Sequence, residues 1–299
     1  MVKRKGDPKL AFLAILMAAL LGGGIAPFIK IGVREIPPLS FTFLRFVLAS
    51  LFLAPFFIKE NSRVGKDIFK IVLFSLLATV NVTFFAFGVK KTTATVAQML
   101  YAAVPIIASS LSYLILKEKI RPRTIIGAGL GLLGVSLIII LPTIEQSFPF
   151  KGNLMGNLLI FVGVFSFSLY SVFSKKFQEN YSPAYLTTVF FLTTTFVLFF
   201  LSFGEFTSYP YWWSNISLDS LLSLLYVGFI GTALFYLLYQ YALKHGTPVI
   251  ASMTLYLQPA ATFIWAAIIL GERVTFGFII GAILALTGAW LVTWSKNVA

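Results

Sequence analysis

The sequence predicts an all-α integral membrane protein of ten transmembrane helices, arranged as two inverted five-helix repeats. Three observations lead to this fold class: the composition, the spacing of long apolar runs, and a similarity between the two halves of the chain. Of the 299 residues, 59% are hydrophobic and only 11% are charged. A soluble globular chain carries about 25% charged residues, so the composition indicates a protein that lies largely within a bilayer.

Ten apolar runs are long enough to cross a bilayer core, which takes about 20 residues per helix. The runs are continuous and do not alternate with a period of two, so helices are expected and strands of a membrane barrel are not. Charges or clusters of Pro, Gly and Asn separate the runs. The expected spans are 10–30, 38–58, 68–89, 92–116, 122–141, 153–174, 183–203, 217–243, 247–270 and 274–294.

The first of these spans follows a basic N-terminal segment and therefore has some features of a signal peptide. Its apolar stretch is longer than the roughly 7–15 residues of a signal-peptide core. In addition, no small-x-small cleavage site follows it in a polar stretch. We therefore expect this span to be retained as a helix.

The distribution of positive charge predicts how the spans are oriented. With a cytoplasmic N-terminus, 16 of the 23 Lys and Arg residues fall in inside segments and six in outside segments, while Arg45 lies within a span. The positive-inside rule accounts for this excess. We therefore expect an inner (plasma) membrane protein with both termini in the cytoplasm. The net charge of +13 then requires no nucleic-acid partner.

The second half of the chain repeats the first. Residues 90–137 laid over residues 244–291 give 16 identities in 48 positions without a gap. Shared composition does not explain a proline, a glutamate and glycines in register. The pairs include Pro105/Pro259, Glu118/Glu272, Gly127/Gly281 and Gly134/Gly288. The expected repeats are residues 1–146 and 147–299.

Five spans per repeat is an odd number, so the second repeat must enter the membrane with the opposite orientation. Inverted repeats are a recurrent architecture of secondary transporters, which bind substrate at the repeat interface near the middle of the membrane. The sequence therefore predicts a secondary carrier that works by alternating access between the two repeats.

Several of these residues resemble a known family. The pattern Phe-Thr-Phe-Leu-Arg-Phe at 41–46, the prolines Pro105 and Pro259, and the glutamates Glu118 and Glu272 are similar to the EamA type of the drug/metabolite transporter superfamily. The resemblance covers about 10–294, in two copies. It implies ten helices, cytoplasmic termini, and alternating-access transport of small organic solutes, with amino acids among the frequent cargo.

Polar stripes on spans four and nine supply the first candidates for substrate binding. Gln98 and Tyr101 lie on one face of span four, and Ser252 and Tyr256 lie on one face of span nine. Polar side chains within membrane helices point inward, where they either join helices or line a cavity. Both interpretations stay open for these four residues.

Spans three, six and eight supply the other candidates. Asn81 is the only asparagine within an expected span of the first repeat, and its amide offers both donors and an acceptor. Tyr170 lies in span six, and Tyr236 and Gln240 share a face of span eight because they are four residues apart. The alternative for each is a structural hydrogen bond between helices.

Five further residues are expected to act in gating or structure. Arg45 within span two must face the interior or pair with carbonyl groups, because a charge in a membrane helix is costly. It is therefore a structural tie or a contact for a substrate carboxylate. Pro105 and Pro259 favour kinks. Glu118 and Glu272 fall at helix ends, where caps or ion pairs are expected.

Missing residue types argue against other classes of protein. The chain has no cysteine and one histidine, so we expect no metal centre, no cofactor and no catalytic residues. A membrane-embedded lipid-modifying enzyme is therefore disfavoured. A passive channel or facilitator for a small solute remains the alternative to a carrier. The expected partners are a small-molecule substrate and the lipid bilayer, and the chain is expected to function as a monomer.

Overall fold

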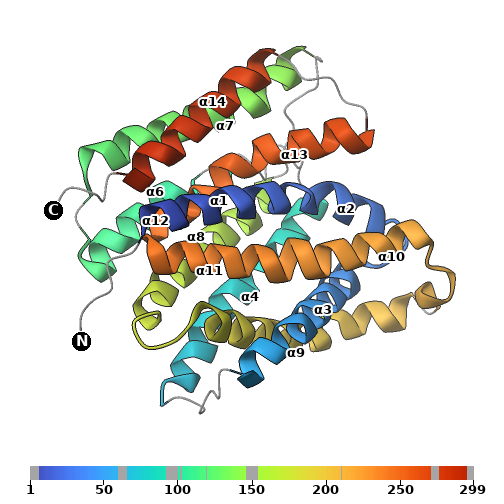
Figure 1. Ribbon diagram of the computed structural model, residues 1–299. Helices are drawn as coiled ribbons and strands as arrows, with labels where there is room; N and C mark the ends of the chain where they lie inside the picture. The colour runs from blue at the N-terminus through green and yellow to red at the C-terminus, as the bar shows by residue number, and fades with distance from the viewer. Residues whose placement is uncertain are drawn as a thin grey trace.

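The computed structural model describes residues 7–59, 66–91, 100–101, 103–118, 120–145, 154–209, 211–270 and 276–294. Over these residues the chain forms a bundle of helices without strands (Figure 1). In chain order the elements are α1 (Pro8–Gly23), α2 (Ile25–Gly32), α3 (Pro38–Lys59), α4 (Ile68–Lys91), α6 (Val104–Leu111), η1 (Ser112–Leu116), α7 (Pro122–Glu145), α8 (Leu154–Phe177), α9 (Pro183–Ser208), η2 (Trp212–Asn215), α10 (Leu218–Leu225), η3 (Tyr226–Leu234), α11 (Phe235–His245), α12 (Pro248–Ser252), α13 (Thr254–Leu270) and α14 (Phe276–Trp294).

Within the described residues, six helical segments are long and apolar enough to cross a membrane, and each coincides with an expected span. Two shorter apolar helices, Val104–Leu116 and Ile279–Val292, fall within two more of the expected runs. The full count of ten spans stays a prediction. The six long segments are Pro8–Ile29, Pro38–Pro55, Ile68–Gly88, Leu154–Phe177, Pro183–Ser208 and Leu218–His245.

Helix pairing follows the repeat. Span four meets span nine where α6 packs on α12, and two pairs of elements at equivalent positions of the two halves pack on each other: α3 on α9, and α7 on α14. The last pair lies side by side at the top of Figure 1. The packing of α4 on α8 has its equivalent in the packing of α11 on α1. Exchange of the two halves thus maps this contact pattern onto itself, as a two-fold arrangement requires.

The first span is interrupted between α1 and α2. Pro27 has no N–H to donate to the carbonyl of Gly23, which favours a break at this point. Three consecutive carbonyls just before the break also accept hydrogen bonds from side chains of the second half. The donors are Trp265 Nε1 to Leu20 O (2.8 Å), Tyr226 Oη to Leu21 O (3.0 Å) and Gln258 Nε2 to Gly22 O (3.0 Å).

Two carboxylates join the halves at the end of the bundle where α3 and α10 begin. Glu205 Oε2 accepts from the backbone N–H (2.8 Å) and hydroxyl (3.1 Å) of Ser40 in the first turn of α3. Glu35 Oε2 accepts from the N–H (2.8 Å) and hydroxyl (2.9 Å) of Ser217, which caps α10. The hydrogen bonds to Glu35, above all the one from the backbone N–H of Ser217, favour its ionised form. They hold the pKa of Glu35 below its ordinary value.

At the other end, α1 begins beside the end of α11, where the backbone N–H of Asp7 lies 3.5 Å from His245 Nδ1. In Figure 1, α1 begins and α14 ends toward this side of the bundle. The interior between the two ends contains many packed aromatic rings. Phe46 of α3 packs edge-on against Phe190 and Phe191 of α9 (ring centroids 5.6 and 5.4 Å apart).

Candidate functional site

A polar cluster in the bundle centres on the amide of Asn81. Asn81 Nδ2 donates to Tyr101 Oη (2.6 Å) and to the carbonyl of Gly163 on α8 (2.9 Å). Close packing of α4 on α8 sets this geometry, because a Cβ at Gly163 would lie 3.2 Å from the Asn81 carbonyl oxygen. Asn81 is buried and Tyr101 is half-buried. The amide is thus fixed, while the phenol faces it from span four.

Arg45 and Tyr236 complete the cluster from two other helices. The guanidinium carbon of Arg45 lies 5.1 Å from the centroid of the Phe46 ring. Its charge lies close enough to the phenols of Tyr236 and Tyr101 to interact with them electrostatically. We call Arg45, Asn81, Tyr101 and Tyr236 the central cluster. The first three come from the first half of the chain and Tyr236 from the second.

Aromatic rings form the walls of the central cluster. Tyr101 meets Phe85 edge-on, with ring centroids 5.5 Å apart. Tyr236 meets Phe190 and Phe191 of α9 in the same manner, at 5.0 and 5.8 Å. The cluster therefore combines one cation, one amide and two phenols with apolar ring faces. Such a surface can bind a small molecule that has a polar end and an apolar body.

Tyr170 and Gln240 belong to a separate, closed network. Gln240 Nε2 donates to Tyr170 Oη (2.6 Å) and to Ser174 Oγ (2.7 Å). Gln178 Nε2 donates to the backbone O (2.8 Å) and Oε1 (2.6 Å) of Gln240. We call these four residues the Gln240 network. Tyr170, Ser174 and Gln240 are fully buried, so they tie α8 to α11 and face no open space in this conformation.

Gln178 and Ser174 were missed as candidates, although a signal was present. Tyr170, Ser174 and Gln178 recur every four residues and therefore share one face of α8. Tyr226 and Trp265, which bond to the carbonyls of α1, were missed as well. Their partners are backbone atoms, and a backbone acceptor leaves no trace in the sequence.

Ser252 and Tyr256 make their contacts with residues outside the central cluster. Ser252 is fully buried, and its hydroxyl donates to the Val249 carbonyl of its own helix at 2.7 Å. Tyr256 is also fully buried, but it packs on α7, where a Cβ at Gly131 would lie only 2.1 Å from its ring. These two residues therefore do not join Asn81 and Tyr101 in this conformation.

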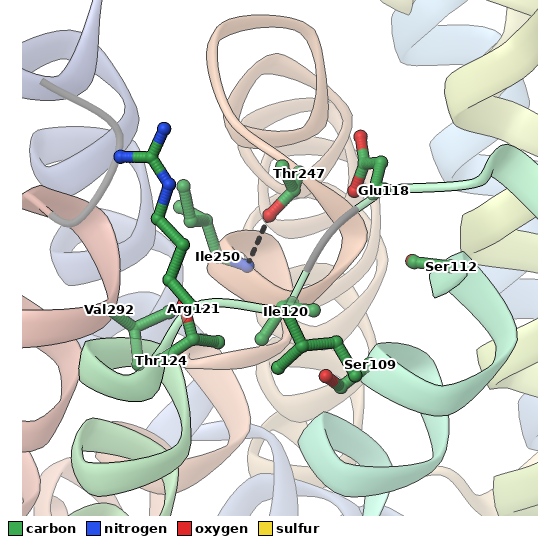
Figure 2. A pocket seen from close by; sticks show the side chains of 10 residues that line it. Ser109, Ser112, Glu118, Ile120, Arg121, Thr124, Thr247, Ile250 and Val292 are labelled. Carbon is green, nitrogen blue, oxygen red and sulfur yellow. Dashed lines mark hydrogen bonds between the residues drawn. The ribbon is translucent and has the colours of Figure 1, made fainter. Parts of the chain in front are cut away.

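A cavity of about 240 Å³ opens where η1 ends and where α7 and α12 begin (Figure 2). Glu118 and Ser112 line it from the first half of the chain and Thr247 from the second. Figure 2 shows the Thr247 hydroxyl turned to the backbone N–H of Ile250, a bond of 3.2 Å. Ligand clefts typically measure about 300–1,000 Å³, so this cavity is small for a substrate site.

The two prolines occupy different places in their helices. Pro105 is the second residue of α6, directly after a turn at Ala103. Pro259 lies inside α13 and cannot donate to the carbonyl four residues before it. Two other candidates, Gln98 and Glu272, lie outside the described residues.

Comparison with known proteins shows the family of this chain. The model of the EamA-like transporter family matches residues 9–140 and again residues 154–294. The chain therefore belongs to the EamA-like transporter family, within the drug/metabolite transporter superfamily, and contains two copies of its domain. Proteins of this family are membrane-embedded transporters, so the chain is a member of a transporter family and is not an enzyme.

Its relatives are similar over most of their length. An uncharacterized transporter of Clostridium kluyveri is 28% identical over 266 residues, covering 87% of this chain and 84% of the relative. One from Archaeoglobus fulgidus is 29% identical over 290 residues, covering 95% and 98%. A WAT1-related protein of Arabidopsis thaliana is 26% identical over 289 residues, covering 87% and 78%.

A solved crystal structure has the same fold. It matches with a TM-score of 0.78 at 17% sequence identity, over 98% of this chain and 100% of that chain. At this identity the likeness concerns the fold alone.

Proposed function

We propose that the protein is a secondary carrier that exports small organic metabolites, such as amino acids, across the inner or plasma membrane. The observation that carries the proposal is the central cluster, to which both halves of the chain contribute. Carriers built from inverted repeats bind substrate where the repeats meet. The cluster offers a fixed amide in Asn81, the phenols of Tyr101 and Tyr236, and aromatic walls for an apolar side chain.

In this proposal the Gln240 network acts as a gate. Gln240 lies four residues after Tyr236 on α11, which is a step of about 6 Å along a helix. The network therefore closes the bundle one turn beyond the central cluster. Alternating access requires α8 and α11 to separate at this level, with Tyr170 and Gln240 then reaching the cargo path. The chain works as a monomer with both termini in the cytoplasm.

Counterflow in proteoliposomes tests the carrier role. Vesicles loaded with a millimolar amino acid should accumulate the same radiolabelled amino acid, and the rate should saturate. A carrier exchanges in this way, whereas a passive channel shows flux without saturation or exchange. A screen of neutral amino acids in which none gives counterflow contradicts the proposal.

The variant Asn81→Ala tests whether the cluster is the site. It removes the donor to Tyr101 and leaves the phenol without this partner. We expect counterflow to fall about tenfold or more, the effect of roughly one or two lost hydrogen bonds. Asn180→Ala is the matched control, since Asn180 is exposed after the end of α8. Equal rates in wild type and Asn81→Ala remove the cluster from the transport path.

A further inference from the structure

Arg45 is a cation inside the bundle that has no counterion among the described residues. No hydrogen bond or ion pair of its side chain occurs within the described part of the chain, and its Nε is shielded from solvent without a partner. Its polar neighbours are the neutral phenols of Tyr236 and Tyr101. A salt bridge joins Lys70 to Asp67 at the start of α4.

A structural role would leave visible bonds. An arginine that ties helices together donates to carbonyl or carboxylate oxygens, because an unpaired buried charge is costly. Arg45 makes none of these bonds. Nor does it reach outward along its helix, since Tyr101 and Tyr236 come from two other helices and face the interior. Within the described part of the chain its donors therefore have no acceptor.

We infer that the missing counterion is the cargo, so that the transported metabolites carry a carboxylate that binds to Arg45. This inference rests on the proposed carrier function and names its substrate class. A guanidinium matches a carboxylate with two parallel hydrogen bonds. One arginine balances one negative charge, whereas a phosphate carries about −1.5 to −2 at neutral pH. The rest of the cargo then lies against the ring faces around Tyr101 and Tyr236.

The aromatic walls can also accept an ammonium group, which is attracted to ring faces. Zwitterionic amino acids and plain monocarboxylates therefore share the chemistry that Arg45 recognises. Matched compounds separate these two sources. The compounds are two amino acids, L-phenylalanine and L-leucine, and the two acids that lack their amine, 3-phenylpropionate and 4-methylpentanoate. Each of the four is compared with its primary amide, which lacks the carboxylate. Comparing the amino acids with the two plain acids shows the effect of the amine.

The experiment is a thermal-shift titration of the purified full chain with these eight compounds. We expect at least one acid to raise the melting temperature while its amide does not. Arg45→Gln should raise the apparent Kd for that acid by about 10- to 100-fold, the range for the loss of hydrogen bonds to a charged group. Arg45→Lys keeps the charge but cannot form two parallel hydrogen bonds, so its apparent Kd should lie between those of wild type and Arg45→Gln. Arg34→Gln, at an exposed arginine of the α2–α3 connection, should bind as wild type.

The ligand-free melting temperature distinguishes this role from a structural one. If Arg45 lacks a counterion, Arg45→Gln melts at or above the wild-type temperature, because an uncompensated charge has been removed. A lower melting temperature in both Arg45→Gln and Arg45→Lys overturns the inference, as does a panel in which no acid exceeds its amide. If acids bind in a way that depends on Arg45 but no counterflow occurs, the anion site at Arg45 stands and the proposed carrier function is refuted. If counterflow occurs at the same rate in wild type and in Arg45→Gln, the carrier function stands and the anion site at Arg45 is refuted.

Discussion

Two glycines of α7, only two residues apart, have different surroundings. Gly131 faces Tyr256, whose ring would lie 2.1 Å from an added Cβ, whereas nothing lies within 4 Å of a Cβ at Gly129. We expect Gly131→Ala to destabilise the protein by about 1–3 kcal/mol through overpacking. Gly129→Ala should be neutral or stabilising by up to about 1 kcal/mol, because alanine favours helix.

Unfolding of the detergent-solubilised protein by heat or denaturant measures both changes. Gly129→Ala is the control for the same substitution on the same helix. If the two variants melt together, Tyr256 does not pack on Gly131 as described.

Single residues were only partly predictable from the sequence. Asn81 and Tyr101 stand out because polar side chains are rare in apolar helices, and the structure brings them to 2.6 Å from each other. Whether Arg45 has a partner depends on what three other helices carry to the same place. That arrangement follows only from the packing of the whole bundle, so the lack of a counterion for Arg45 among the described residues is visible only in the structure.

At the scale of helices, the Gln240 network and the central cluster differ in how far their residues are buried. Ser174 of the Gln240 network is fully buried, whereas Tyr236 and Tyr101 of the central cluster are half-buried. The chain has no cysteine, so single-cysteine variants report one position each. We expect Tyr236→Cys and Tyr101→Cys to react with a small maleimide in the folded protein, and Ser174→Cys to react far more slowly.

Lys70→Cys, at an exposed position near the start of α4, serves as the fully reactive control. After denaturation in dodecyl sulphate all four variants should label equally. Labelling of Ser174→Cys at the rate of Tyr236→Cys would show that the Gln240 network does not close the bundle.

The six long spans among the described residues were predictable from the sequence, because a long apolar run has one stable form in lipid. The breaks within them were not. The interruption at Gly24 depends on Pro27, which the sequence shows, but also on Tyr226 and Trp265, which supply donors to carbonyls of α1. The π-helical turns of η1 and η3 likewise lie in continuous apolar runs. Such breaks depend on tertiary partners and leave the composition of the run unchanged.

At the scale of the whole molecule, the repeat was predictable because a proline, a glutamate and glycines recur in register. The structure adds that α3 packs on α9 and α7 on α14, each element on its equivalent. The orientation of the second repeat relative to the membrane is a further prediction. It follows from five spans per repeat, and the charge distribution agrees with it.

The connections around Lys66 and Trp213 test this orientation, because they follow the second span of each repeat. Inverted repeats place them on opposite sides of the membrane, whereas parallel repeats would place them on the same side. Both residues are exposed. We expect a membrane-impermeant maleimide to label Trp213→Cys in intact cells and Lys66→Cys only after permeabilisation. Denatured samples control for expression. Labelling of both positions from one side would exclude the inverted arrangement, and with it alternating access by the exchange of two equivalent halves.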